Sequence, residues 1–85
     1  MYYVYVLRSI KFGKYYIGST NNIINRLKKH NSGLVKSTKS FKPWKLAYSK
    51  VYNTRSEAFK REKYLKSLKK RSAIEKIIGH HGPIV

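Results

Sequence analysis

The stretch YIGSTNNIINRLKKH, residues 16–30, places the end of a strand directly before the start of a helix. It begins with aromatic and β-branched residues, which favour extended backbone. Gly18 then ends the extended run and allows other backbone to come close. Thr20, Asn21 and Asn22 follow, and their side-chain oxygens are of the kind that cap the free N–H groups of a helix's first turn. The stretch therefore predicts a strand-to-helix junction.

The helix that follows has one apolar face and a pair of polar residues at the edge of that face. Ile23, Ile24 and Leu27 recur at helical spacing and are expected to face the core. Arg26 and His30 are four residues apart and therefore lie on neighbouring turns. An Arg and a His held side by side at the rim of a core are suited to meeting a phosphate. The alternative is that both are ordinary solvated side chains on a helix surface.

Three strands are predicted from runs of aromatic and β-branched residues. The first strand alternates Tyr3, Tyr5 and Leu7 on one face with Tyr2 and two valines on the other. Because both faces are apolar, we expect both to be at least partly covered. Hairpin pairing depends on the loop length, so the sequence does not tell which tyrosines of the first two strands share a face. The strands are expected over residues 2–7, 14–19 and 44–52.

Three helices complete the prediction. The first runs from about residue 21 to residues 30–32, with Gly33 as a left-handed residue at its C-terminal end. The second begins after a capping-box sequence at residues 54–57, and the third covers residues 72–78 before Gly79. The order ββαβαα indicates a single α+β domain, residues 1–78, with a short tail, residues 79–85. The core residues expected from the last two helices are Ala58, Phe59, Leu65, Leu68, Ile74, Ile77 and Ile78.

The composition fits one small domain inside a cell. The chain has 85 residues, of which 41% are hydrophobic, enough for one modest core. The absence of cysteine excludes disulfides and thiolate metal sites and is compatible with a cytoplasmic location. The longest apolar run, residues 1–7, is far too short to span a bilayer and lacks the features of a signal peptide.

Charge is the strongest compositional signal. Twenty Lys and Arg residues face three Glu and no Asp, which gives a net charge of +17. Most of this charge has no partner within the chain, so we expect the partner to be a polyanion, nucleic acid before an anionic membrane. Membrane binding is the less favoured alternative, because a small core needs the apolar stripes of the helices. The eight tyrosines are compatible with stacking on bases, although a tyrosine-rich core explains them equally well.

Basic and histidine residues outside the helices provide further candidates for binding. Lys36, Lys39 and Lys42 lie in the loop of residues 34–43 and either contact a phosphate backbone or are merely solvated. His80 and His81 are adjacent in the tail and form a weak candidate for metal ligation, since no other ligands are near them in the sequence.

Glu62 is the one carboxylate without an ordinary structural role. Glu57 belongs to the capping box, and Glu75 lies among surface charges. Glu62 is four residues after Ala58 and three before Leu65, so it lies within the apolar stripe of its helix. A carboxylate on the core side costs several kcal/mol unless it is paired or binds a cation. An ion pair and a metal site both remain open.

The residue types allow only a limited set of chemistries. Three Glu and no Asp argue against two-metal hydrolysis, which needs several carboxylates. Phosphate-binding glycine motifs and zinc-binding spacings are absent, and a serine triad lacks a carboxylate partner. One carboxylate, however, suffices for a single Mg²⁺ that keeps its waters and takes other ligands from a substrate phosphate. Together with one Arg, one His and several tyrosines, these are the groups of a one-metal phosphodiesterase.

Five positions give the sequence a specific resemblance to the GIY-YIG nuclease domain over residues 1–76. The second signature is intact at residues 16–18, and at residues 3–5 Tyr-Val-Tyr stands where the family has Gly-Ile-Tyr. Arg26 and His30 match the family's helix motif, and Glu62 matches its metal-binding glutamate. The sequence is most similar to the small stand-alone bacterial members, which resemble the catalytic domain of the excision-repair endonuclease UvrC.

The resemblance implies a small three-stranded antiparallel sheet flanked by helices and a metal-dependent DNA endonuclease acting on branched, nicked or damaged DNA. By position, Tyr5 would be the general base or would orient the attacking water, and Arg26 would stabilise charge on the scissile phosphate. Glu62 would hold a single Mg²⁺ or Mn²⁺, without any small-molecule cofactor. Tyr16 and His30 would assist in positioning or proton transfer. Target choice would come from the domain itself, from the DNA structure or from a protein partner, in a cytoplasmic, nucleoid-associated protein.

Two departures from the family pattern keep an alternative open. Tyr3 replaces the first glycine, and no Asn follows Asn53, whereas many family enzymes carry an Asn after the glutamate. The alternative is a non-catalytic basic module that binds DNA or RNA and retains the fold. A ribosome-associated structural protein is the third hypothesis.

Overall fold

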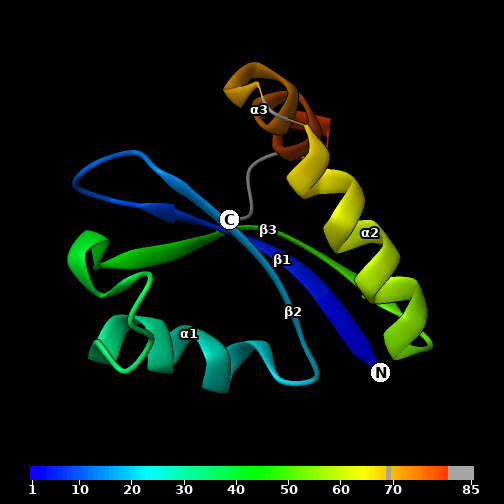
Figure 1. Ribbon diagram of the computed structural model, residues 1–85, viewed down its shortest axis with the longest axis horizontal. Helices are drawn as coiled ribbons and strands as arrows, with labels where there is room; N and C mark the ends of the chain where they lie inside the picture. Colours follow the sequence, from blue (N-terminus) through cyan, green and yellow to red (C-terminus); the bar gives the residue numbers. More distant parts are fainter. Residues whose placement is uncertain (69, 81–85) are drawn as a thin grey trace.

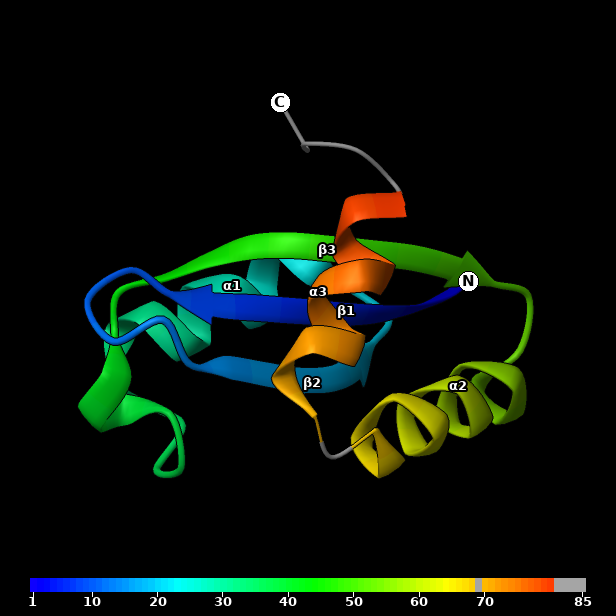
Figure 2. The ribbon, with the colours of Figure 1, turned by 90° about the horizontal axis from the view of Figure 1, so that it is seen from above.

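The computed structural model describes residues 1–68 and 70–80 and has the predicted order ββαβαα (Figure 1). Strands β1, β2 and β3 form one antiparallel sheet in the order β2-β1-β3, so that β1 is the central strand (Figure 2). The predicted α+β class and three-stranded antiparallel sheet are thereby confirmed. The elements are β1 (Tyr2–Ser9), β2 (Tyr15–Thr20), α1 (Ile23–Ser32), the short 3₁₀ helix η1 (Lys39–Phe41), β3 (Trp44–Tyr52), α2 (Arg55–Ser67) and α3 (Arg71–His80).

The two faces of the sheet are covered by different helices, as Figure 1 shows for α1 and α2. Val4 and Val6 point to the side of α2 and α3, where they pack against residues such as Leu65; we call this side the α2–α3 face. Tyr5 and Leu7 point to the opposite side, which we call the α1 face. The predicted alternation of β1 is confirmed, because a strand covered on both sides needs apolar residues on both.

The caps predicted from the sequence set the ends of the first two helices. The Asn22 side chain accepts a hydrogen bond from the Asn25 backbone N–H, and Gly33 ends α1 in the left-handed region with φ 82°. Thr54 and Glu57 form both hydrogen bonds of a capping box at the start of α2. Local sequence therefore decides where these helices start and where α1 ends.

Several predicted boundaries are wrong by one or two residues. β1 continues beyond Leu7 to Ser9, and β2 begins at Tyr15 and continues through Gly18 to Thr20. α3 does not end at Ile78 but continues through Gly79. Glycine lowers helix propensity without blocking helical backbone, so a helix held by its packed face can continue across it. Residues 81–85 of the predicted tail, including His81 of the histidine pair, lie outside the described residues.

Two residues predicted to be in the core are exposed instead. Ile24 is 71% exposed and Phe59 is 52% exposed, whereas the neighbouring Ala58 is buried. Each helix turns only one narrow face to the sheet, and a residue next to a buried one points about 100° away from it.

Within the described residues, no helix combines the length and the apolar character needed to cross a membrane.

Candidate active site

Tyr5 lies in the middle of the central strand and crosses over the glycine of the neighbouring strand. Gly18 is the partner of Tyr5 in the β1–β2 register. A Cβ atom built on Gly18 would lie 2.5 Å from the Tyr5 hydroxyl oxygen and 2.7 Å from its ring carbon Cζ. No side chain fits under the phenol, so Gly18 is required for space. A close approach at this glycine was predicted, but the approaching group is the Tyr5 ring and not the backbone expected from the sequence.

The Tyr5 phenol ends at a buried histidine. Its hydroxyl lies 3.2 Å from His30 Nε2, and His30 Nδ1 lies 2.8 Å from Thr38 Oγ1. Thr38 donates its one hydroxyl hydrogen to the Val35 carbonyl, so Thr38 Oγ1 accepts from Nδ1–H. His30 Nε2 is then free to accept the Tyr5 hydroxyl hydrogen. The hydrogen-bond network assigns this tautomer, and it makes Tyr5 the donor and His30 the acceptor.

Tyr16 completes an aromatic group on the α1 face. Its ring centroid lies 4.8 Å from that of His30 and 6.4 Å from that of Tyr5. Tyr16 is half-buried, whereas Tyr5 and His30 are buried. Of these three side chains, Tyr16 therefore reaches furthest toward solvent.

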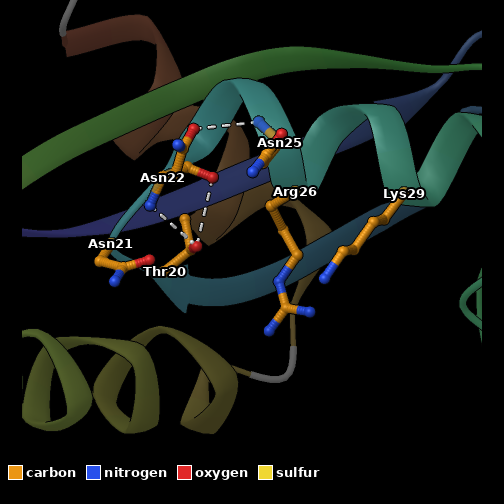
Figure 3. A pocket seen from close by; sticks show the side chains of 6 residues that line it. All are labelled: Thr20, Asn21, Asn22, Asn25, Arg26 and Lys29. Carbon is orange, nitrogen blue, oxygen red and sulfur yellow. Dashed lines mark hydrogen bonds between the residues drawn. The ribbon is translucent and has the colours of Figure 1, made fainter.

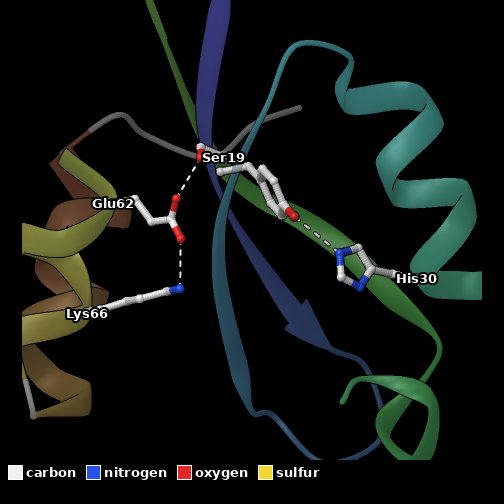
Figure 4. Close-up of polar contacts among 5 residues, drawn as sticks. Ser19, His30, Glu62 and Lys66 are labelled. Atoms are coloured by element: carbon white, nitrogen blue, oxygen red, sulfur yellow. Dashed lines mark hydrogen bonds and ion pairs between the residues drawn. The ribbon is translucent and has the colours of Figure 1, made fainter. Parts of the chain in front are cut away.

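Glu62 approaches β2 from the other side (Figure 4). Its Oε1 accepts a hydrogen bond of 2.6 Å from the Ser19 hydroxyl, and its Oε2 forms a 2.7 Å ion pair with Lys66 Nζ. The Glu62 side chain is only 14% exposed, which confirms its predicted position toward the core side. The ion pair considered from the sequence is present, and Lys66 is its partner.

Arg26 acts on residues on both sides of β2. It lines an open pocket of about 280 Å³ together with Ser19, the hydrogen-bond partner of Glu62. The positive charge of Arg26 also acts on the ionisation of Tyr5, His30 and Glu62. A second pocket adjoins the first, and Figure 3 shows Arg26 and Lys29 extending from α1 in the same direction at its rim. The residues that line this second pocket are Thr20, Asn21, Asn22, Asn25, Arg26 and Lys29.

The environment sets the protonation states of the aromatic group. Burial raises the pKa of Tyr5 to about 12; the charges of Tyr16 and Glu62 add to this rise, and the charge and side-chain hydrogen bond of Arg26 oppose it. Burial lowers the pKa of His30, and the positive charge of Arg26 lowers it further. At neutral pH, Tyr5 is therefore a neutral donor and His30 a neutral acceptor, as the hydrogen-bond network requires.

Glu62 is ionised at neutral pH. Burial acts to raise the pKa of its carboxyl, but hydrogen bonds from Lys66 and Ser19 and the charges of Lys66 and Arg26 outweigh burial and lower it below 4.5. The residues fit a singly ligated ion, because Oε2 already contacts a cationic group and Ser19 fixes the other oxygen. Among residues 1–68 and 70–80, no group of three or more His, Cys, Asp or Glu side chains could hold a metal ion. Water and phosphate would have to supply the remaining ligands of an ion at Glu62.

The structure brings the predicted site residues to one edge of the sheet, with β2 between them. Three residues of the network were missed in the sequence: Ser19, Thr38 and Lys66. Lys66 is four residues after Glu62, a spacing typical of helical ion pairs and a signal available in the sequence. The roles of Ser19 and Thr38 depend on strand register and loop path, for which the sequence gives no periodic signal.

Two of the loop lysines lie at the C-terminal end of α1, where Lys39 directly follows Thr38 of the network. A Cβ atom on Gly33 would lie 3.4 Å from Lys42 Nζ and 3.7 Å from Lys39 Cγ, so both side chains reach the C-terminal end of α1. The free carbonyls of a helix C-terminus attract cations, which gives these two lysines a structural role. Lys36 is exposed. Contact of Lys36, Lys39 and Lys42 with nucleic acid stays a prediction.

Comparison with known proteins identifies the family. A family model for the GIY-YIG catalytic domain matches residues 1–76. A UPF0213 protein of Bacillus licheniformis is 43% identical over 72 residues, which cover 84% of this chain and 73% of that protein. A UPF0213 protein of Clostridium perfringens is 38% identical over 78 residues, which cover 91% of this chain and 83% of that protein.

A solved structure agrees with the sequence matches. The solution NMR structure of a UPF0213 protein from Bacillus halodurans superimposes with a TM-score of 0.62 at 32% sequence identity, covering 96% of this chain and 87% of that one. The names of these relatives specify no reaction. The family match over residues 1–76 and the similarity to small bacterial UPF0213 proteins show that the chain belongs to the GIY-YIG family of nucleases.

Proposed function

We propose that the protein is a metal-dependent DNA endonuclease that hydrolyses a phosphodiester in branched, nicked or damaged DNA during repair or recombination. The observation that carries this proposal is the arrangement around β2. The Tyr5–His30 pair lies on one side of β2 and the ionised Glu62 on the other, and Arg26 lines a pocket together with Ser19, the hydrogen-bond partner of Glu62. The net charge of +17 supports a polyanionic substrate.

Tyr5 and His30 provide the path for the proton of the attacking water. A phenol with a pKa of about 12 is a weak acid that does not ionise by itself at neutral pH. It can accept a proton from water while it passes its own hydroxyl proton to His30 Nε2, which has a free lone pair. Thr38 holds His30 in the required tautomer. Tyr16 would position the water or the phosphate beside this pair.

Arg26, and an ion held by Glu62, would neutralise negative charge on the scissile phosphate. A guanidinium group can donate two parallel hydrogen bonds to phosphate oxygens. Glu62 would hold a single Mg²⁺ or Mn²⁺ through Oε2, the oxygen now paired with the half-exposed Lys66, while Ser19 keeps Oε1 in place. When bound, such an ion neutralises charge on the phosphate and lowers the pKa of coordinated water.

Cleavage of labelled duplex, flap and four-way-junction DNA in Mg²⁺ tests the proposal. We expect the wild type to cut and Glu62→Ala and Tyr5→Phe to lose at least about 100-fold in rate while still binding DNA, because each removes a reacting group. Glu75→Ala is the matched control, since Glu75 also forms an ion pair with the cation four residues away but lies on α3. It should cut at the wild-type rate.

Tight, salt-sensitive binding without cutting in either Mg²⁺ or Mn²⁺ would contradict the proposal. That result would favour the non-catalytic DNA- or RNA-binding module. We propose a cytoplasmic, nucleoid-associated location in a bacterial cell, where the proposed substrate is present, and a protein partner that selects the target.

A further inference from the structure

The turn between β1 and β2 exposes an apolar surface. Ile10 is 61% exposed and Phe12 is 58% exposed. The Phe12 ring meets the half-buried Phe41 ring edge-to-face, with centroids 5.5 Å apart and an interplanar angle of 89°. We call Ile10, Phe12 and Phe41 the hairpin platform. Because the two phenylalanine rings are in contact, they form one apolar surface at the turn, of the kind on which a ligand can bind.

The hairpin platform is held rigidly. The hydroxyl of the buried Ser9 donates to the Phe41 carbonyl at 2.6 Å and accepts from the Phe12 backbone N–H at 3.2 Å. The Ser9 carbonyl accepts from the Gly13 N–H, and the Ser9 N–H donates to the Lys14 carbonyl, both at 2.8 Å. Gly13 supplies the positive φ of 67° that closes the turn. One buried serine therefore holds the backbone of both phenylalanines, and less backbone freedom remains to be lost on binding.

Cations surround the hairpin platform. Lys14 Nζ lies 4.2 Å from the centroid of the Phe41 ring. A Cβ atom on Gly13 would lie 3.2 Å from a guanidinium nitrogen of Arg71 and 3.7 Å from one of Arg8. Lys11 is part of the turn itself. The ligand that fits this combination has a flat apolar face and an anionic backbone.

We propose that the hairpin platform binds an unpaired nucleobase, with the base stacked on Phe12 and the adjacent phosphates facing Lys11 and Lys14. Unpaired bases expose the flat faces that stack on aromatic side chains, whereas a duplex presents its phosphates and base edges. This inference rests on the proposed function only in taking DNA as the partner.

The spacing between the hairpin platform and the candidate active site fits one DNA strand. Tyr5 and Ser9 are four residues apart on β1, roughly 13 Å at the usual rise of a strand. The hairpin platform lies beyond Ser9, at the end of the same strand that carries Tyr5. A DNA strand that follows β1 from the candidate active site therefore leads to Phe12, which suits DNA with an unpaired segment next to the cut.

Fluorescence anisotropy without divalent metal tests the inference, using labelled single-stranded DNA and a blunt duplex of equal length. We expect Phe12→Ala to weaken binding to the single strand about tenfold, because one stacking contact is lost, and to change duplex binding less than about twofold. Phe12→Trp should bind like the wild type. Phe59→Ala is the matched control, because Phe59 is another exposed phenylalanine and has Lys63 Nζ 5.2 Å from its ring centroid. Circular dichroism should show an unchanged fold for all three variants.

Several results would overturn the inference. The first is an equal loss by Phe12→Ala on the two DNA forms, and the second is a similar loss in Phe59→Ala. The third is a wild-type dimer in sedimentation that Phe12→Ala dissolves, which would assign the hairpin platform to a second copy of this chain. The fourth is binding to anionic vesicles that depends on Phe12 while DNA binding does not.

The outcomes separate the two proposals. Selective loss of single-strand binding in Phe12→Ala, without Glu62-dependent cutting, would support the nucleobase site and contradict the endonuclease proposal. Glu62-dependent cutting with normal single-strand binding by Phe12→Ala would support the endonuclease proposal and contradict the nucleobase site. A wild type that binds no nucleic acid would contradict both proposals.

Discussion

The two faces of the sheet use alternate residues of the same strand for different purposes. On the α2–α3 face, Val4 and Val6 are buried against apolar side chains such as Leu65. On the α1 face, Tyr5 is equally buried, but its hydroxyl is bonded to His30. Burial of apolar surface is favourable in itself, whereas a buried polar network only offsets its own desolvation.

The residues that stabilise the fold and the residues proposed to carry out the chemistry therefore alternate along the same strand and point to opposite faces of the sheet. The α2–α3 face should supply most of the free energy of folding, and the α1 face should tolerate changes that leave its volume intact. Burying a histidine and a phenol costs free energy of desolvation. The hydrogen bond between them only offsets this cost, so the pair adds little to the free energy of folding. Their retention on the α1 face is consistent with a functional site.

The largest effect is expected from Leu65→Ala on the α2–α3 face. Leu65 is fully buried, and the substitution leaves a cavity against β1, so we expect the free energy of unfolding to fall by about 2–5 kcal/mol. Urea denaturation at neutral pH measures it. Leu34→Ala, at an exposed leucine, should change stability by less than about 0.5 kcal/mol. A loss below about 1 kcal/mol at Leu65 would contradict the assignment of the stabilising core to this face.

An intermediate effect is expected from Gly18→Ala on the α1 face. The new Cβ would lie 2.5 Å from the Tyr5 hydroxyl, so the phenol must move and its hydrogen bond to His30 must stretch. We expect a loss of about 1–3 kcal/mol in stability from overpacking, together with a loss of the nuclease activity proposed above. Thermal denaturation and the rate of DNA cleavage measure the two effects.

Gly79→Ala is the opposite case and serves as the control. A Cβ atom on Gly79 meets no atom within 4 Å, and the residue lies within α3. Alanine is favoured over glycine in a helix by about 0.5–1 kcal/mol, so this variant should be slightly stabilised. If both variants were equally stable, the phenol would not be crossing over Gly18 in solution.

Gly18 also shows how far sequence reasoning reaches. A glycine after an aromatic and β-branched run predicted that other backbone comes close, whereas the group that comes close is a side chain, the Tyr5 ring. The approaching group could not be predicted, because the β1–β2 register depends on the conformation of the turn. Only that register sets Gly18 opposite Tyr5 and turns Ser19 toward Glu62.

Helical periodicity was informative for Glu62 but not for every apolar residue. The stripe that contains Ala58 and Leu65 correctly predicted a carboxylate on the core side. The same periodicity placed Ile24 and Phe59 in the core, and both are exposed. A pattern gives the direction of the buried face, whereas its width depends on how closely the helix lies on the sheet, which is a tertiary property.

The smallest effect is the pH dependence that the α1 face adds to stability. Burial, followed by the charge of Arg26, lowers the pKa of His30 in the folded protein below its ordinary value of 6.5. As the pH falls, the unfolded chain therefore takes up a proton before the folded protein does. The contribution of neutral His30 to stability is complete above about pH 6.5 and is lost as the pH passes through the lower folded pKa.

Urea denaturation between pH 8 and about pH 5 should show stability falling with acidification, and His30→Gln should flatten the curve. The lowered pKa of Glu62 acts only below about pH 4.5 and does not overlap this range. A rise in stability between pH 7 and pH 5 would mean that His30 is protonated in the fold, and Tyr5 would then have no proton acceptor.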